Sequence, residues 1–307
     1  MTLRPFTDSD YARYTALRNL WERPEMSEAE VRDEDVRANP EDLRLKFVVE
    51  VASEVVGFST AIREVDDPTG RWWVSATVDP LHRRRGYGRA LASAAIEEAR
   101  SRGAVETWDY FRDDSAPSRA FAATLRAEYV EHVFESVVDP RTIDDALLQE
   151  ALESLADFHV TTFEPSDDAV RRLHDLFVSI EADEPGIYHG VRRPFSGFML
   201  EIVGDPAFRP EGVQIVVDGD RWVGLSMVGL KEAQAHNIQT GLLSEYRGRG
   251  LGRGVKALSI AYCRRAGAIS IRTNNHSANA PMLAINRRFG FVPEPGWLCY
   301  RLPLEAR

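Results

Sequence analysis

Two arginine- and glycine-rich segments stand 164 positions apart (250 − 86) and contain the residue types that bind anions. The two segments comprise Arg83, Arg84, Arg85, Gly86, Tyr87, Gly88 and Arg89, then Arg247, Gly248, Arg249, Gly250, Leu251, Gly252 and Arg253. Glycine lets the backbone approach a ligand closely. At the start of a helix, unpaired N–H groups and the helix dipole attract negative charge. Arginine adds forked donors that fit phosphate oxygens. Each segment is therefore predicted to bind a diphosphate.

The repeat extends well beyond the glycines. At the same offset, Leu91 pairs with Val255 on the apolar face of the following helix, and Ala116-Pro117 pairs with Ala280-Pro281 at the start of a later one. A chance match would not keep this register without a gap. We therefore interpret the chain as a duplicated domain.

The length and composition agree with a duplication. The chain has 307 residues, enough for two domains of ordinary size, which we predict at 1–157 and 158–307. We find no apolar run of about 18 residues, so neither a membrane protein nor a secreted one is expected. The default location is the cytoplasm. Cys263 and Cys299 have no metal-ligand spacing, so no metal site is predicted.

The charge limits the possible partners. The net charge of −10 argues against general binding of nucleic acid, whose phosphates attract basic surfaces. An acidic surface would suit a cationic substrate, although it also serves simply to keep a protein solvated. The sequence leaves open whether the chain is a monomer or a homodimer.

Periodicity predicts the same order of elements in both halves. Helices are expected over 8–19, 27–37, 86–100, 115–126, 143–155, 167–179, 250–265 and 280–288. Strands are expected over 47–51, 55–63, 72–78, 105–108, 130–138, 213–217, 221–230, 236–243, 269–273 and 298–302. This order predicts an α/β (α+β) protein, in which each half is a mixed, mostly antiparallel twisted sheet flanked by helices.

An Arg-x-x-Gly-x-Gly motif between a strand and a helix resembles the GNAT superfamily of acetyltransferases. The second half adds a longer pattern made of Thr273, Asn275, Asn279, Met282, Asn286, Phe289, Gly290 and Phe291. With this pattern the whole chain resembles the tandem GNAT proteins, such as the mycothiol synthase-like two-domain members. The resemblance implies acetyl-CoA, or another acyl-CoA, as the donor and an amine as the acceptor.

The resemblance also implies where the donor binds. In that family the fourth strand splays from the fifth and leaves free backbone groups beside the pantetheine arm. The backbones expected there are those of Val78, Asp79, Leu242 and Leu243. The glycine loops would hold the pyrophosphate, and the side chains expected on the cofactor side are Asn275, Asn279 and Asn286.

The two halves differ at the positions of the chemistry. Proteins of that family often have a glutamate on the fourth strand that acts as the catalytic base. At this position the second half has His236, which can accept a proton near neutral pH. The first half has Trp72, which cannot act as a base. The family's usual catalytic acid is a tyrosine. At its position the second half has Asn286 and the first half has Ala122. Tyr300 could supply that proton instead. The simpler alternatives are a hydrogen-bonded strand histidine and a packed core tyrosine.

These differences predict a catalytic C-terminal half and an N-terminal half that keeps its phosphate site without the reaction. The main hypothesis is an N-acetyltransferase that moves an acetyl group to a small amine by direct attack in a ternary complex. Two alternatives are a non-catalytic acyl-CoA sensor and a protein or peptide N-acetyltransferase. Acidic residues at Glu181, Asp183 and Glu184 could attract a cationic amine.

Overall fold

The computed structural model describes residues 1–22, 25–65, 67 and 69–304, and it divides into two compact units. Unit 1 comprises Met1–Phe111, Ser115–Val130 and Cys299–Arg307. Unit 2 comprises Arg112–Asp114 and Glu131–Leu298. Each unit is therefore assembled from segments that are far apart in the sequence.

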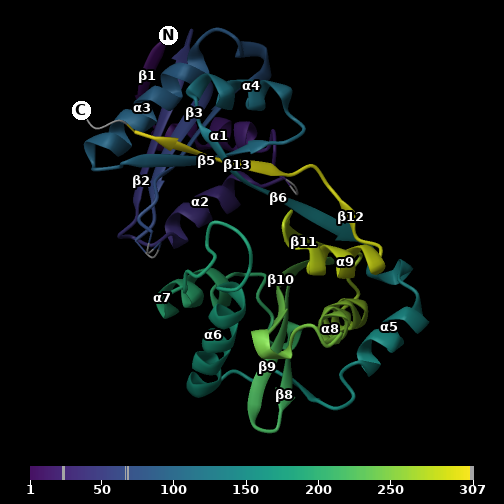
Figure 1. Cartoon of the computed structure of the whole chain (residues 1–307). Helices are drawn as coiled ribbons and strands as arrows, with labels where there is room; N and C mark the ends of the chain where they lie inside the picture. Colours follow the sequence, from purple (N-terminus) through teal and green to yellow (C-terminus); the bar gives the residue numbers. More distant parts are fainter. Residues whose placement is uncertain (23–24, 66, 68, 305–307) are drawn as a thin grey trace. The chain divides into compact units, whose positions relative to one another are not determined.

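Unit 1 is a mixed sheet with helices packed against it (Figure 1). Its strands follow the order β1 (Thr2–Pro5), β2 (Leu43–Val51), β3 (Glu54–Arg63), β4 (Trp73–Val78), β5 (Glu106–Arg112) and β13 (Trp297–Pro303). Its helices are α1 (Tyr11–Arg18), α2 (Glu28–Arg37), α3 (Tyr87–Ser101) and α4 (Ala116–Leu125). The pairings from β1 to β4 are antiparallel, and β4 pairs with β5 in parallel.

Unit 2 repeats this arrangement. Its strands follow the order β6 (Glu128–Val138), β11 (Ser270–His276), β10 (Gln234–Leu242), β9 (Arg221–Lys231), β8 (Val213–Asp218) and β7 (His159–Thr162), with β12 (Val292–Pro293) also paired to β6. Its helices are α5 (Asp145–Glu153), α6 (Asp167–Glu181), α7 (Phe195–Phe198), α8 (Leu251–Arg265) and α9 (Ala280–Arg288). Only β10 and β11 pair in parallel among the recorded ladders. The predicted fold class is confirmed in both units.

Two strands are exchanged between the halves of the sequence. Most of β6, from Glu131 onward, pairs with β11 in unit 2, although it follows the helices of the first half. Conversely β13, at the yellow end of the chain in Figure 1, lies beside β5 in unit 1. The exchange obeys the internal repeat, because Glu128 at the start of β6 and Val292 at the start of β12 are again 164 positions apart (292 − 128).

The predicted boundary between residues 157 and 158 stays a prediction of where the duplication joins. The compact units cross that boundary in both directions, since residues 131–157 belong to unit 2 and residues 299–304 to unit 1. A reading of the sequence in linear order has no means of detecting an exchange of strands.

The helices that follow the glycine loops each bury one face in the core of their unit. In unit 1, α3 buries Leu91 and Ala95 against the sheet. In unit 2, α8 packs on the sheet and also on α5, next to it in Figure 1. A Cβ at Gly254 would lie only 2.5 Å from the hydroxyl oxygen of Ser154 and 2.9 Å from the carbonyl of Ala151. Glycine at this position therefore lets α8 approach α5 closely.

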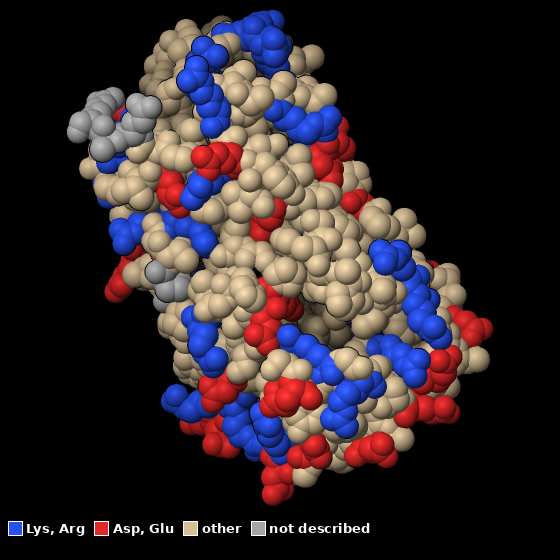
Figure 2. Space-filling view, in the orientation of Figure 1, with Lys and Arg blue, Asp and Glu red and all other residues tan. Residues whose placement is uncertain are grey.

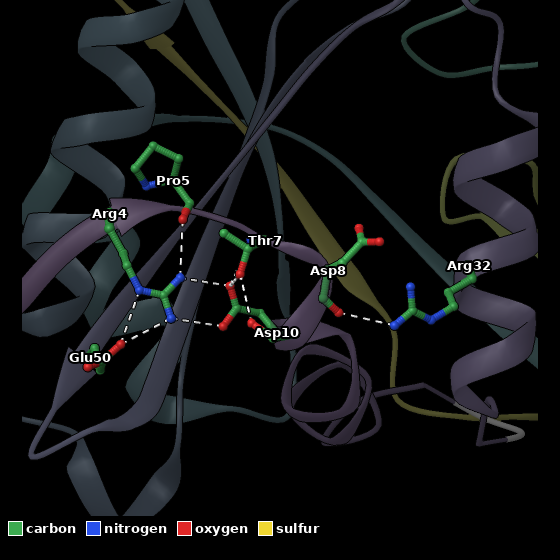
Figure 3. Close-up of polar contacts among 8 residues, drawn as sticks. Arg4, Pro5, Thr7, Asp8, Asp10, Arg32 and Glu50 are labelled. Carbon is green, nitrogen blue, oxygen red and sulfur yellow. Dashed lines mark hydrogen bonds and ion pairs between the residues drawn. The ribbon is translucent and has the colours of Figure 1, made fainter.

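An ion-pair cluster fastens the first strand of unit 1, as Figure 3 shows. The Arg4 guanidinium donates to both carboxylate oxygens of Asp10, at 2.8 and 2.9 Å, and to Glu50 at 3.1 Å. Asp10 is buried and also accepts from the backbone N–H of Thr7. The hydrogen bonds from Arg4 lower the pKa of Asp10 to about 2, so the pair stays charged over the ordinary pH range.

The sequence does not predict the edge strands β1 and β7, the short strand β12 or the short helix α7. β1 and β7 are both 4 residues long and contain no fully buried side chain, so they lack the alternation that marks a half-buried strand. The other expected helices and strands are present, with ends shifted by a few residues. None of the helices within the described residues is long and apolar enough to cross a membrane.

Removing residues 299–307 should unfold unit 1 selectively. This segment gives unit 1 the hydrogen bond from the backbone N–H of Leu304, directly after β13, to the carbonyl of Val105 at 2.8 Å, and the edge-to-face contact of Tyr300 with Phe111. We expect amide-exchange protection in β5 to fall at least ~10-fold while protection in β9 is retained. Hydrogen exchange read by mass spectrometry checks this, with a chain lacking only residues 305–307 as the control. Equal loss in β9 would contradict two separate units.

Candidate active site

The glycine loops have the same backbone geometry in both units. Gly86 and Gly250 are the N-cap residues of α3 and α8, with φ of 86° and 81°. A Cβ at either position would meet nothing within 4 Å, so glycine is needed there for its left-handed conformation and not for space. This conformation turns the chain into the helix so that the first N–H groups face outward. This backbone geometry is the one that the predicted anion sites require, and binding of an anion there stays a prediction.

The first arginine of each loop binds the strand that precedes it. Arg83 Nε donates to the carbonyl of Val78 at 3.0 Å, and Arg247 Nε donates to that of Leu242 at 2.9 Å. The two contacts are again 164 positions apart (242 − 78). They hold each loop at the end of its strand, so both arginines have a positioning contact in addition to the phosphate role predicted from the sequence.

The central strands splay apart directly before these loops, as the family resemblance implies. In unit 2, β10 pairs with β11 only as far as Asn237 opposite Thr273, whereas its pairing with β9 continues to Leu242. In unit 1, the recorded register of β4 with β5 is a single pair, Trp73 with Trp108. Each unit therefore has an opening between two parallel strands that leads to its glycine loop.

Of the four residues whose backbones are predicted to contact the cofactor, two have N–H groups that face this opening. The N–H of Leu243 donates to Val223 of β9, and the N–H of Asp79 donates to Val56 of β3, both at 2.9 Å. These two donors are used within the sheet, which corrects the expectation that they are free for a cofactor. Because successive residues of a strand point to opposite sides, the N–H groups of Leu242 and Val78 face the opening instead.

Unit 1 has a large cavity at its opening, of about 410 Å³. Its lining includes the predicted residues Val78, Arg83, Arg84, Gly86, Tyr87, Gly88 and Arg89. The opposite wall is apolar and includes Phe111 and Phe121. None of the described residues that line this cavity is acidic. The cavity can hold an extended anionic ligand, but its described lining offers no carboxylate to accept a proton.

Unit 2 has a smaller and more polar cavity, of about 100 Å³, at the point where β10 and β11 separate. Its lining comprises Glu184, Pro185, Asn237, Ile238, Gln239, Thr240, Lys256, Thr273, Asn274, His276, Asn279 and Met282. The register of β10 with β9 shifts between Asn237 and Gln239, so a bulge turns these side chains toward the cavity.

Glu184 is the carboxylate at this cavity. Of the three acidic residues noted in this segment, Glu181 pairs with Arg193 at 3.0 Å and Asp183 pairs with Arg247 at 3.1 Å. Glu184 instead accepts a hydrogen bond from the Gln239 amide at 3.2 Å. Glu184 is exposed as a whole residue, but burial of its carboxyl group and then the charge of Glu181 raise the pKa of Glu184 to about 7. It can therefore exchange a proton near neutral pH.

The predicted asparagines divide into two groups. Asn279 lines the cavity, and its side chain caps α9 by accepting from the N–H of Met282 at 3.3 Å. Asn275 and Asn286 are buried, and the Asn286 amide donates to Asn275 at 2.7 Å. Asn275 in turn donates to Ser136 of β6 at 3.0 Å. These two residues therefore fix β11, α9 and β6 to one another, and a contact with a cofactor stays a prediction for them.

His236 does not reach the cavity of unit 2. It lies on β10 opposite Gly229 and Arg272, and it is not among the described residues that line the cavity, although the next four residues of the strand are. Burial lowers the pKa of His236, so the imidazole is neutral near pH 7 and could accept a proton. The His236 ring is therefore neutral, as a base must be, but it does not line the cavity.

Tyr300 and His236 belong to different units. Tyr300 lies on the exchanged strand β13, and its ring contacts Phe111 and Tyr129 of unit 1 at centroid distances of 5.5 and 5.9 Å. The expectation that it completes the site of the second half assumed that the last strand stays with that half. The exchange of β13 removes this basis, and the packed-tyrosine alternative describes its surroundings better.

The remaining loop residues of unit 2 have mixed surroundings. Leu251 is buried in the core, and Arg253 pairs with Glu150 of α5 at 3.2 Å. Gly248 and Gly252 lie on either side of Gly250, and Arg249 lies over the Tyr246 ring at 5.7 Å. In unit 1, Arg85 is exposed. Binding of a phosphate by these residues stays a prediction.

Comparison with known proteins agrees with this geometry. Residues 11–125, which include the first glycine loop, match the model of the acetyltransferase (GNAT) family. The chain is similar to mycothiol acetyltransferases, with 24% identity over 263 residues to that of Corynebacterium glutamicum (83% of this chain, 86% of the relative). Identity to that of Streptomyces bingchenggensis is 26% over 278 residues, or 87% of this chain and 83% of the relative.

Solved structures share the fold over the full length. The tandem GNAT protein from the clavulanic acid biosynthesis pathway superposes with a TM-score of 0.75 at 21% identity, covering 100% of this chain and 99% of that one. A GCN5-related N-acetyltransferase from Sphaerobacter thermophilus gives a TM-score of 0.75 at 17% identity, covering 99% and 96%.

These findings show a GNAT acetyltransferase domain at residues 11–125 and an N-acetyltransferase with mycothiol acetyltransferases among its relatives, which confirms the resemblance seen in the sequence. More particularly, it has the two-unit architecture of the tandem GNAT proteins.

Aspartate at either loop glycine should remove one binding site for coenzyme A. If both loops bind, calorimetry on the unmodified chain gives two sites, and Gly86→Asp and Gly250→Asp each leave one. The cause is a carboxylate in the anion site, added to about 1–2 kcal/mol of backbone strain. Gly103 and Gly267 also have positive φ, at the far ends of α3 and α8. Gly103→Asp and Gly267→Asp should therefore keep both binding sites. If either variant loses a site, backbone strain alone explains the loss in Gly86→Asp and Gly250→Asp.

Proposed function

We propose that this protein transfers an acetyl group from acetyl-CoA to the amine of a small molecule, by direct attack of the amine in a ternary complex. In this proposal unit 2 performs the reaction. Unit 1 binds an acyl-CoA with its glycine loop but does not react. The observation that carries the proposal is the Glu184 carboxylate on the cavity where β10 and β11 separate.

Glu184 would remove the proton that an incoming ammonium must lose. An amine attacks a carbonyl only in its neutral form, and a carboxylate with a pKa of about 7 accepts that proton near neutral pH. The Gln239 amide holds the carboxylate toward β10 through its 3.2 Å hydrogen bond. The neutral amine attacks the thioester carbon, and the C–S bond breaks after the C–N bond has formed. The nitrogen loses a second proton in this step, so one of the two protons ends on the departing sulfur and the other is released to solvent.

The chain's own donors would hold and polarise the thioester. Acetyl-CoA supplies an acyl group that is activated by its C–S bond. The outward N–H groups after Gly250 suit its pyrophosphate, and the N–H of Leu242 suits an amide of its pantetheine arm. Donors aimed at the thioester carbonyl from the edge of a strand would stabilise the charge that develops on its oxygen.

A small acceptor is supported by the relatives. The similar proteins of Corynebacterium glutamicum and Streptomyces bingchenggensis are named mycothiol acetyltransferases, and the chain covers most of their length. The surface gives no contrary sign, since basic and acidic side chains alternate over the face shown in Figure 2. A cytoplasmic location, and a monomeric or homodimeric state, stay predictions.

A non-catalytic acyl-CoA sensor is the second candidate. It is favoured because other residues replace the tyrosine that acts as the acid in the family. Asn286 occupies this position in the second half and donates to Asn275, and Ala122 occupies it in the first half and is fully buried. Neither side chain can protonate a thiolate. Amine-dependent release of free coenzyme A would reject the sensor, whereas binding without release across a broad panel of amines would favour it. The same panel, extended with peptides, also tests whether the protein acetylates peptides.

Replacing Glu184 should reduce turnover far more than donor affinity. We expect Glu184→Gln to lower kcat for thiol release roughly 100-fold or more, which is the usual contribution of a general base, with an unchanged Kd for acetyl-CoA. Glu181→Gln removes a neighbouring carboxylate that already pairs with Arg193, and it should cost less than about 10-fold. His236→Gln tests the residue predicted from the sequence. A larger loss from His236→Gln than from Glu184→Gln would transfer the role of base to the histidine.

The pH profile should report the same group. Because burial raises the pKa of Glu184 to about 7, its basic form appears only as the pH rises through that value. We expect kcat to increase between about pH 6 and 8 and the increase to vanish in Glu184→Gln. A strongly basic acceptor amine stays an ammonium over this range, so its own titration does not contribute to the profile. An unchanged profile in the variant would exclude Glu184 as the titrating group.

A further inference from the structure

Lys256 is a fully buried lysine that borders the cavity of unit 2. Its exposed fraction is 0%, and it lies on α8, one turn and a half beyond the glycine loop. Its amine nitrogen is 3.4 Å from the hydroxyl of Thr273 and 4.6 Å from the centre of the Phe291 ring. Among the residues that the structure describes, no carboxylate pairs with it. A buried ammonium without a counter-ion is costly.

Packing does not require a lysine at this position. At the repeat offset, Ala92 occupies the same place on α3 and is 4% exposed (256 − 92 = 164). A methyl group therefore suffices where the helix faces the sheet in unit 1. In unit 2 the burial of the amine lowers the pKa of Lys256 to about 7. A ligand that provides negative charge would restore the charged form.

The rest of the cavity is built for a polar group. Hydrogen-bonding side chains line the same cavity as Lys256, among them Asn237, Thr240 and Asn279. An acetyl methyl would gain little from these neighbours, since polar groups that lose water need partners. The cavity of unit 1 has apolar walls in contrast, including Phe111 and Phe121.

We propose that this cavity binds a carboxylate of one of the reactants, with Lys256 as its counter-ion and the surrounding amides and hydroxyls as further donors. The inference rests on the proposed function of unit 2. The carboxylate can come from an acyl-CoA whose acyl chain ends in one, such as malonyl-CoA or succinyl-CoA. It can also come from an amino-acid acceptor.

The other titratable groups near the cavity are compatible with such a ligand. His276 accepts from the N–H of Ala278 through Nδ1, so Nε2 carries the proton and faces Glu131 at 3.4 Å. Glu184 lines the same cavity and would meet the amine of an acceptor. Cys263 on α8 is a neutral thiol because burial raises its pKa to about 12. His236 on β10 is neutral, since burial lowers its pKa. Lys256 is thus the cation available to a bound carboxylate.

Lysine NMR can observe the proposed contact directly. The chain has only Lys46, Lys231 and Lys256, so ¹³C-labelled lysine gives three side-chain signals, assigned with Lys256→Met. We expect succinyl-CoA or malonyl-CoA to raise the pKa of Lys256 by at least about one unit, if the acyl chain is the source. Glutamate added with acetyl-CoA should do so if the acceptor is the source. Acetyl-CoA alone should not. Failure of all the carboxylate probes to move the Lys256 signal would overturn the proposal.

Kinetics separate this proposal from the proposed function. Thiol release is measured with acetyl-CoA, malonyl-CoA and succinyl-CoA, each with glucosamine and with glutamate. Lys256→Met should lower kcat/KM roughly 10-fold or more for carboxylate-bearing pairs only. Lys231→Met, an exposed lysine of the same unit, is the control. Equal losses for acetyl-CoA with glucosamine would refute a carboxylate site. If no combination of donor and acceptor releases thiol, the proposed function is refuted. The NMR titration then still tests whether Lys256 binds a carboxylate.

Discussion

The contact of one arginine with one strand carbonyl, made once in each unit, organises both sites. Arg83 and Arg247 hold the glycine loops against the ends of β4 and β10, at the point where these strands leave their parallel neighbours. The loop, the helix start and the opening between the strands are thereby fixed together. One ligand with an anionic group and an extended chain, as proposed for acetyl-CoA, would then reach both the helix N-terminus and the opening between the strands. This explains why a single offset of 164 residues relates the sequence motif to the site geometry.

The exchange of β6 and β13 gives the duplication a structural consequence. Each unit needs a strand that the other half of the sequence supplies, so neither half of the chain contains a complete sheet. This arrangement also separates residues that are close in sequence. Tyr300 belongs to the second half of the sequence but packs in unit 1. Most of β6 belongs to unit 2 although it comes from the first half, and its Ser136 accepts a hydrogen bond from Asn275 there.

The two units share a scaffold and differ in charge chemistry. Unit 1 combines a large cavity with apolar walls and arginines, which suits binding of a long anionic ligand. Unit 2 brings Glu184 and Lys256 to a small polar cavity, and burial brings the pKa of each to about 7. In the proposed function this difference divides the work, because one copy would bind an acyl-CoA while the ionisable groups of the other would provide proton transfer and charge recognition.

The sequence by itself determined the duplication, the fold class and the two anion loops, because glycine spacing and apolar periodicity are local properties that a linear pattern records. It also singled out the difference between the halves at His236 and Trp72. The tertiary structure alone decided which side chains share a cavity. Glu184 comes from a loop without any motif, and Lys256 sits one position off the apolar stripe of its helix. Long-range burial and strand exchange set their surroundings, and neither leaves a periodic trace in the chain.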